Sequence, residues 1–209
     1  MADAQTSGRG RRGRTWFSPP QAGLYVSTIL MPSRSPDRER ATLLTTLAAG
    51  VALVEGITQA TGLVAALKWP NDLYVARRKL AGILAEGASD AVVLGYGINV
   101  SPASYPAELG DRATSLETEL GRSVDRPRVF AETLAALASR YQDLLDGRFD
   151  AILDAWRALA PAGRGARVSW TTPAGEQSGV TAGIDDRGAL LVRVGDRTER
   201  IVAGELQWL

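Results

Sequence analysis

Few side chains in this chain can carry out chemistry, because it contains no cysteine and no histidine. Their absence excludes disulfides, thiol nucleophiles, Cys/His zinc sites and every histidine-based triad or general base. Among its 24 basic residues, only Lys68 and Lys79 are lysines. Arginine keeps its proton in proteins. Chemistry that needs a lysine must therefore use Lys68 or Lys79, while Tyr, Asp and Glu remain for proton transfer.

The segment Gly8–Arg14 interleaves glycine and arginine as GRGRRGR. Glycine lets a backbone approach a ligand closely, and arginine offers forked donors to phosphate. The segment is not a Walker loop, because no Gly-Lys-Ser/Thr follows. A solvated basic tail and an Arg-Gly nucleic-acid segment are alternative interpretations. Because Trp16, two prolines and a strand-like run follow directly, we interpret the segment as an internal loop of a domain.

Residues 68–72 (KWPND) place a lysine, a large aromatic and an amide–carboxylate pair at the end of a predicted strand. Strand ends are common positions for polar ligand contacts. The same residues are also typical of a turn, since Pro-Asn-Asp is favourable turn chemistry. Taken alone, this segment favours the turn.

Two predicted strands carry glycines among apolar residues: KLAGILAE (79–86) contains Gly82, and GYGIN (95–99) contains Gly95 and Gly97. A glycine inside a strand indicates close approach of a ligand or of another backbone. Two such neighbouring strands would form a slot for a flat or chain-like apolar ligand. A bulge or tight packing is the alternative.

The elements that must position these motifs belong to a globular chain of 209 residues, with 45% hydrophobic and 22% charged residues. The net charge of +1 argues against a generic polyanion binder. Purely apolar runs long enough to span a membrane are absent, and so is an apolar signal core. We expect the cytoplasm, with an organellar transit peptide as the less favoured interpretation.

Apolar periodicity predicts a run of strands with helices grouped around it. Strands are expected at 24–31, 64–69, 72–75, 80–86 and 91–99, and helices at 38–61, 126–145 and 149–159. This order predicts an α+β fold whose helices lie mainly on one face of the sheet. We expect the aliphatic face of the first helix and the region of Trp156 to be core.

The composition changes at Ala160–Gly165, which reads as a linker. Short strands are expected after it, at 167–171, 179–184, 189–194, 198–202 and 205–209, with a turn at 173–175. Strands at this spacing predict a small β-barrel. We therefore divide the chain into residues 1–162 and a barrel at 163–209 that docks on the larger part.

Together, these residues resemble the biotin protein ligases. The motifs that carry the resemblance are Ala2–Thr6, GRGRRGR, Trp16, Ser18–Pro20, LYVS (24–27), KWPND, KLAGIL, GYGIN and Thr114–Leu116, with Gly204-Glu205 in the barrel. The resemblance implies a mixed β-sheet of the type found in class II aminoacyl-tRNA synthetases and biotin/lipoate ligases. It also implies an SH3-like barrel and a monofunctional enzyme without a helix-turn-helix domain.

The resemblance further implies an ATP-dependent, Mg²⁺-requiring ligase that makes biotinyl-AMP. It would then transfer biotin to a lysine of a biotin carboxyl carrier protein or domain of an acetyl-CoA or acyl-CoA carboxylase. Neither DNA nor a membrane is an expected partner. Because dimers occur in the family, the resemblance also suggests a homodimer.

The resemblance also assigns roles to individual residues. Lys79, Arg11 and Arg9 are the expected catalytic groups. The expected biotin contacts are Gln5, Gly8, Arg9, Arg11, Lys79, Gly82, Leu84, Gly95 and Gly97. The expected nucleotide contacts are Arg11, Arg12, Trp16, Lys68, Asn71, Lys79 and Asn99, and Asp72 is assigned to Mg²⁺.

The chain departs from the family at its beginning, where catalytic domains carry further residues before the Gln5-Thr6 segment. We therefore expect the recorded chain to be truncated at its N-terminus. Three alternatives stay open: a lipoate ligase or octanoyl transferase, a nucleic-acid binder that uses the Arg-Gly loop, and an incomplete enzyme that binds AMP-like ligands weakly.

Overall fold

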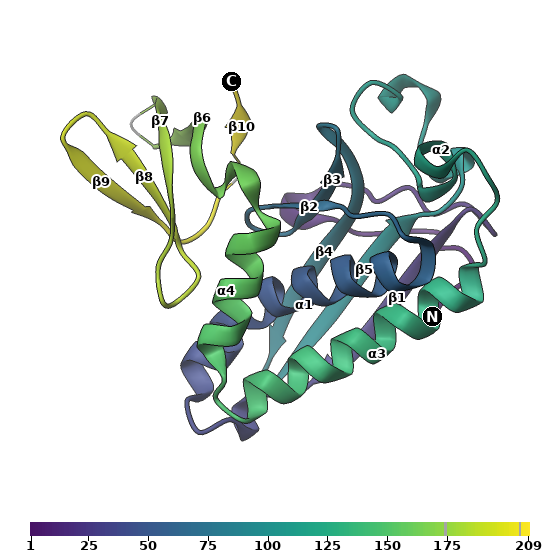
Figure 1. Ribbon diagram of the computed structural model, residues 1–209, viewed down its shortest axis with the longest axis horizontal. Coiled ribbons are helices and arrows are strands. Elements are labelled where there is room, and N and C mark those ends of the chain that lie inside the picture. Colours follow the sequence, from purple (N-terminus) through teal and green to yellow (C-terminus); the bar gives the residue numbers. More distant parts are fainter. Residues whose placement is uncertain (174, 205) are drawn as a thin grey trace.

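The computed structural model describes every residue except Ala174 and Glu205. Its larger sheet has five strands in the order β1-β5-β4-β3-β2 (Figure 1). The strands are β1 (Gly23–Leu30), β2 (Ala66–Lys68), β3 (Asp72–Val75), β4 (Arg78–Ala88) and β5 (Ala91–Asn99). Hence the expected strands are present, although the one expected at 64–69 is shorter and the one expected at 80–86 is longer.

The strands β2, β3, β4 and β5 follow one another through tight turns, which make these neighbours antiparallel. At the β3–β4 turn, Ala76 and Arg77 both have positive φ (45° and 68°), the backbone that suits a two-residue hairpin. Every named strand pair is antiparallel, and the parallel contact found among the described residues is the isolated bridge from Lys79 to Ala113. The sheet expected to be mixed is thus antiparallel apart from that bridge.

Helices cover one face of this sheet, as the order of elements predicted (Figure 1). They are α1 (Arg38–Thr61), α3 (Arg126–Leu145) and α4 (Phe149–Leu159), with a short α2 (Leu116–Leu120) that was not predicted. Single 3-10 turns occur at Arg11–Gly13, Pro32–Arg34, Pro102–Ser104, Ala107–Leu109 and Pro161–Gly163.

The central helix α1 is bounded by its own capping residues. The side chain of Asp37 accepts a hydrogen bond from the Arg40 N–H (3.0 Å), and Gly62 ends the helix with a positive φ of 82°. By length and composition α1 could cross a membrane, but 72% of its apolar window is buried inside the molecule. It is therefore a core helix.

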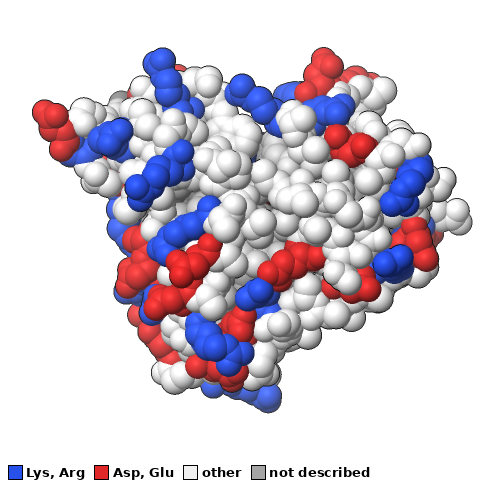
Figure 2. Space-filling model, in the orientation of Figure 1, with Lys and Arg blue, Asp and Glu red and all other residues white. Residues whose placement is uncertain are grey.

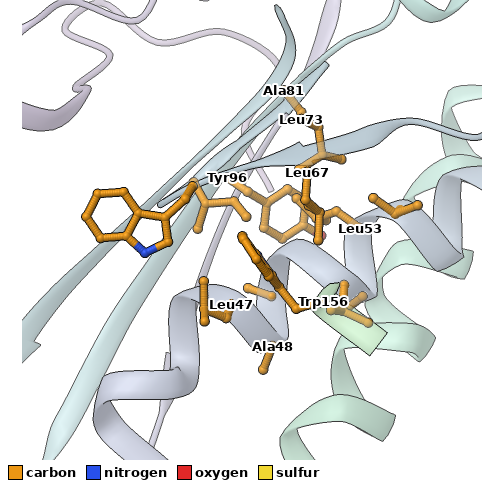
Figure 3. Packing of buried hydrophobic residues seen from close by; sticks show 14 of the residues in the cluster. Leu47, Ala48, Leu53, Leu67, Leu73, Ala81, Tyr96 and Trp156 are labelled. Atoms are coloured by element: carbon orange, nitrogen blue, oxygen red, sulfur yellow. The ribbon is translucent and has the colours of Figure 1, made fainter. Parts of the chain in front are cut away.

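The main core lies between α1 and the sheet (Figure 3). Leu47 and Leu53 of α1 pack against Leu67 and Tyr96 of the sheet, and Trp156 of α4 joins them. All are nearly or completely buried. The expectation that the aliphatic face of the first helix and Trp156 are core is confirmed except at Leu43, which is exposed.

The C-terminal strands form a second five-stranded sheet in the order β10-β6-β7-β8-β9, which fits an SH3-like barrel. They are β6 (Arg164–Thr172), β7 (Gly175–Ile184), β8 (Leu190–Val194), β9 (Arg197–Ile201) and β10 (Gln207–Trp208). The turn expected at 173–175 and the strand expected at 205–209 each include one residue, Ala174 and Glu205, outside the described residues.

The barrel docks on the larger part through its β7–β8 turn. The Trp69 indole N–H donates to the Gly188 carbonyl (3.0 Å), and the Arg40 side chain donates to the Asp186 carbonyl (2.9 Å). Barrel residues such as Val168 and Leu190 also belong to the same apolar cluster as α1. The docking expected from the small size of the barrel is confirmed.

Candidate functional site

A cavity of about 740 Å³ opens on the side of the sheet that faces away from the helices. Successive side chains of a strand point to opposite faces of a sheet. In β5, Tyr96 and Ile98 therefore point into the core, whereas Gly95, Gly97 and Asn99 face the cavity. The cavity is completed by the Arg-Gly loop, the KWPND segment, the 104–113 connection and the end of the barrel.

Gly82 and Gly97 are directly paired across β4 and β5, and they form the floor of this cavity. The indole of Trp16 lies against both of them. A methyl group on Gly97 would lie 2.4 Å from Trp16 Nε1, and one on Gly82 would lie 3.0 Å from the indole ring. Only glycine at these positions leaves room for the indole. The glycine slot predicted from the two strands is present, and the Trp16 side chain covers it here.

The Trp16 indole N–H is buried and has no hydrogen-bond partner among the described residues. A buried donor without a partner is uncommon and energetically costly. The ammonium of Lys79 lies 5.5 Å from the centre of the Trp16 ring, within the range of a cation–π contact. Trp16 is therefore held by packing and charge rather than by a hydrogen bond of its N–H.

The Arg-Gly loop is an internal loop of the domain, as predicted, and it folds back on itself as a hairpin. The N–H of Trp16 donates to the Gly8 carbonyl (2.9 Å), and the N–H of Gly10 donates to the Arg14 carbonyl (2.7 Å). Gly8 is buried beneath the loop, where a methyl group would lie 2.3 Å from the Trp16 carbonyl oxygen. Gly8 does not line the cavity, so its expected contact with biotin stays a prediction.

Two arginines of the loop are held across the cavity by residues far away in the sequence. The Arg11 guanidinium donates to the Asn71 side-chain oxygen (2.9 Å), 60 residues away. Arg9 forms an ion pair with Glu86 (2.8 Å) at the exposed rim. The loop thus closes against both the KWPND segment and β4.

Lys79 forms an ion pair with Asp72, with 2.6 Å between the ammonium nitrogen and a carboxylate oxygen. The backbone of Lys79 is held on the other side, because its N–H donates to the Arg112 carbonyl (2.8 Å) and its carbonyl accepts from the Thr114 N–H (2.9 Å). These contacts hold the Lys79 backbone in place and leave its partly exposed ammonium at the cavity wall beside Asp72.

Asp72 meets only part of what a magnesium site requires. Mg²⁺ usually takes one or two carboxylates together with water and substrate phosphates. The described residues contain no cluster of three or more metal-ligating side chains, and the Asp72 carboxylate is already paired with Lys79. A bound Mg²⁺ would therefore be held mainly by the phosphates of a nucleotide, with Asp72 as a single protein ligand in competition with Lys79.

The remaining assigned side chains line the same cavity, several of them in internal hydrogen bonds. The Asn99 amide donates to the Thr114 carbonyl (2.9 Å), and the Asn71 amide donates to the Ile83 carbonyl (2.7 Å). Gln5 accepts from the Ser18 hydroxyl (2.7 Å). Apart from Gly8, every residue that the sequence assigned to the site lines this cavity.

Sequence reasoning missed several cavity residues. Glu86, the partner of Arg9, ends the KLAGILAE run and could have been suspected from that position. Tyr105 and Arg112 come from an irregular connection that has no periodicity, so no sequence signal marks them. Leu206, which follows an undescribed residue of the barrel, also lines the cavity.

The cavity combines an apolar floor with a basic wall. Among the described residues, seven cationic side chains line it, against the carboxylates of Asp72 and Glu86; the cations are Arg9, Arg11, Arg12, Arg14, Lys68, Lys79 and Arg112. Elsewhere, on the face shown in Figure 2, basic and acidic side chains are intermixed along the edges. The cavity is therefore suited to an anionic group, such as a carboxylate or phosphate, joined to an apolar body.

Two family models match the chain. The "Biotin/lipoate A/B protein ligase family" matches residues 1–101, and the "Biotin protein ligase C terminal domain" matches residues 165–207. A biotin--[acetyl-CoA-carboxylase] ligase from Paracoccus denitrificans is 36% identical over 92% of this chain and 82% of that protein.

A bifunctional ligase/repressor from Bacillus subtilis is also 36% identical, over 99% of this chain. The match covers 65% of the Bacillus protein, so the chain spans about two thirds of that relative's length. A solved biotin protein ligase from Aquifex aeolicus in complex with biotin and ATP superimposes with a TM-score of 0.84. It is 29% identical, and the match covers 99% of this chain and 86% of that one.

Proposed function

This chain belongs to the biotin protein ligase family, and from that premise we propose that it joins biotin to a carrier protein with ATP as the energy source. The observation that carries the proposal is the meeting of a glycine-floored slot with Lys79 and Arg11 in one cavity. An apolar slot suits the ring and chain of biotin, and the cations suit its carboxylate and the phosphates of ATP.

The first step is the activation of biotin. A carboxylate oxygen of biotin attacks the α-phosphorus of ATP, the bond to the bridging oxygen breaks, and pyrophosphate leaves with that oxygen. Lys79 neutralises the charge that builds on the α-phosphate, and Arg9 and Arg11 bind the carboxylate and phosphate. Because the nucleophile is supplied by the substrate, the protein contributes position and charge. The absence of cysteine and histidine fits this chemistry.

The second step is transfer to the carrier. The amine of a carrier lysine attacks the carbonyl carbon of biotinyl-AMP, an amide bond forms, and AMP leaves while the amine loses a proton. The residues around the slot would hold the biotinyl group; we assign Gln5, Gly82, Leu84, Gly95 and Gly97 to this role. Arg12, Trp16, Lys68, Asn71 and Asn99 are assigned to the nucleotide. Mg²⁺, when bound with ATP, would lower the negative charge of the phosphates.

The partner that we infer is a biotin carboxyl carrier protein or domain of an acetyl-CoA or acyl-CoA carboxylase; the name of the Paracoccus relative gives acetyl-CoA-carboxylase for that protein. We place the enzyme in the cytoplasm, without DNA as a ligand, and a homodimer stays a prediction. We assign the activity to residues 1–162 and the barrel to residues 163–209.

The proposal is tested by replacing Lys79 with alanine. We expect biotin-dependent exchange of labelled pyrophosphate into ATP to fall by about 10²–10³-fold, the usual effect of losing one group that stabilises transition-state charge. Arg38→Ala is a matched control, because it removes an exposed cation that pairs with Asp90, and neither residue lines the cavity. Unchanged exchange in Lys79→Ala would remove the role assigned to Lys79.

The wild-type protein tests the activity itself. With biotin, ATP and Mg²⁺ it should form biotinyl-AMP and label a carrier domain, and failure to do so contradicts the ligase. Competition between biotin and lipoate separates the ligase from a lipoate ligase. An octanoyl transferase is disfavoured, because the transferases that resemble this fold use a cysteine and this chain contains none. A nucleic-acid binder is disfavoured because the loop arginines close onto the cavity.

A further inference from the structure

The ammonium of Lys68 is held between two aromatic rings from different parts of the fold. Its nitrogen lies 5.0 Å from the centre of the Tyr74 ring and 4.6 Å from that of Trp208. The two rings are themselves 5.4 Å apart and tilted by 48°. Both distances to the nitrogen are within the range of cation–π attraction. We call this arrangement of Lys68, Tyr74 and Trp208 the aromatic clamp.

Each member of the clamp is positioned by a strand. Lys68 ends β2 and Tyr74 lies in β3, and these strands pair at the edge of the larger sheet. Trp208 lies in β10, which pairs with β6 of the barrel and stands next to β2 and β3 (Figure 1). The clamp therefore joins the barrel directly to the sheet edge that carries the KWPND segment.

The clamp also reaches the wall of the cavity. Lys68 and Tyr74 both line it, and so do Gly204 and Leu206 of the segment that leads to β10. Lys68 is paired in register with Asp72, the residue that holds Lys79. The barrel residue Trp208 thus contacts the Lys68 ammonium. The sheet neighbour of Lys68, Asp72, forms the ion pair with Lys79.

We propose that Trp208 is a positioning residue, which holds the Lys68 ammonium at the cavity wall for the phosphates of ATP. A lysine side chain is long and flexible, and fixing it costs conformational entropy. An aromatic clamp assembled before ATP arrives removes part of that cost at the moment of binding. Lys68 and Trp208 are 140 positions apart in sequence, so only docking of the barrel brings them together. The choice of ATP as the ligand rests on the proposed ligase function, whereas the clamp itself does not depend on that function.

The clamp can be observed without any ligand, because the chain has just two lysines. Reductive methylation with ¹³C-formaldehyde keeps the charge of each lysine and labels both with NMR-visible methyl groups. We expect the Lys68 signal, assigned by its loss in Lys68→Arg, to lie upfield because of the two ring currents. Trp208→Ala should move it towards the position of free dimethyllysine, and Trp208→Phe should keep much of the shift. The Lys79 signal serves as the internal reference.

Adenylation kinetics test the consequence for ATP. Trp208→Ala should raise KM for ATP by about threefold to tenfold, as expected for losing one partly buried cation–π contact. The KM for biotin should stay close to the wild-type value, and Trp208→Phe should recover most of the ATP effect. Leu209→Ala is the matched control, because it removes an exposed apolar side chain from the neighbouring position. Thermal unfolding of each variant shows whether the barrel is intact.

The outcomes separate the two levels of the proposal. A Lys68 signal at the free position in the wild-type protein, or one that Trp208→Ala leaves unchanged, overturns the clamp. A shift that disappears in Trp208→Ala while KM for ATP is unaltered overturns the positioning role. If the wild-type protein shows the clamp but forms no biotinyl-AMP, the ligase proposal fails and the clamp stands.

Discussion

Trp16 decides which part of the cavity floor a ligand can reach. Its indole rests on Gly82 and Gly97, two of the residues assigned to biotin, and a side chain on Gly97 would displace it. Gly95 is different, since a methyl group there would meet its nearest neighbour at 3.7 Å, an ordinary contact. Biotin can touch Gly82 and Gly97 only after the indole has moved.

We therefore expect biotin to change the environment of Trp16. Its indole leaves a partly buried site beside Lys79, so the tryptophan emission should shift to longer wavelength as biotin is added. Four other tryptophans contribute to the signal, and the comparison is therefore with Trp16→Phe, in which the biotin-dependent part should disappear. An identical spectral change in wild type and variant would show that the indole stays on the two glycines.

At the scale of elements, the packing of α1 against α3 depends on one glycine. A methyl group on Gly56 would lie 2.5 Å from the Cα and 2.6 Å from the backbone nitrogen of Thr133 in α3. Backbone atoms cannot move aside as a flexible side chain can. A methyl group on Gly50, in the same helix, would meet only side-chain ends, those of Leu67 at 3.1 Å and Ile83 at 3.8 Å. The two glycines therefore serve different purposes.

Gly56→Ala and Gly50→Ala form a matched pair. We expect Gly56→Ala to lower the free energy of unfolding by about 1–3 kcal/mol, the usual cost of overpacking a core. Gly50→Ala should be neutral or stabilising, because alanine favours a helix over glycine by about 1 kcal/mol and Leu67 can adjust. Urea unfolding of both variants measures the difference. Equal losses would mean that the backbone approach at Thr133 does not limit the packing.

At the scale of the whole molecule, the β7–β8 turn of the barrel contacts the larger part of the chain. Gly188 of this turn accepts the hydrogen bond from Trp69, and Arg187 forms an ion pair with Glu39 of α1. Asp185 shapes the turn, because its carboxylate accepts from the N–H groups of Arg187 (2.9 Å) and Ala189 (2.8 Å) and pairs with Arg200. Loss of the Asp185 charge should therefore weaken the turn that the docking uses.

The charge of Asp185 makes stability depend on pH. Burial alone would raise the pKa of its carboxyl, but the Arg200 guanidinium and the two backbone N–H groups favour the carboxylate and hold the pKa below its ordinary value of 3.8. A group whose pKa is lowered by folding stabilises the folded state above its unfolded pKa. That stabilisation is lost as the pH falls through the lower, folded pKa.

Asp185→Asn should accordingly lower the free energy of unfolding by about 1–2 kcal/mol at pH 7, the scale of a hydrogen-bonded charge that remains partly solvated. The difference between wild type and variant should shrink steadily below pH 3.8. Urea unfolding at pH 7, 5 and 3 measures it. A difference of the same size at pH 3 and pH 7 would show that the carboxylate charge contributes nothing.

The sequence alone determined the longer helices, most of the strands and part of the inventory of the site. Periodic apolar residues predicted α1, α3 and α4, and turn residues separated the strands, because both signals arise from neighbours within a few positions. The glycines of β4 and β5 and the loop arginines were found in the same way. The roles of these residues came from resemblance, and the cavity now groups all of them except Gly8.

Only the tertiary structure decided which of these side chains meet. Arg9 pairs with Glu86 over 77 positions, and Trp16 lies on the pair formed by Gly82 and Gly97. Such contacts depend on strand register, on closure of the loop and on docking of the barrel, none of which a local pattern encodes. The two lysines were conspicuous from the beginning. Their partners, Asp72 for one and the Tyr74–Trp208 pair for the other, follow from the fold alone.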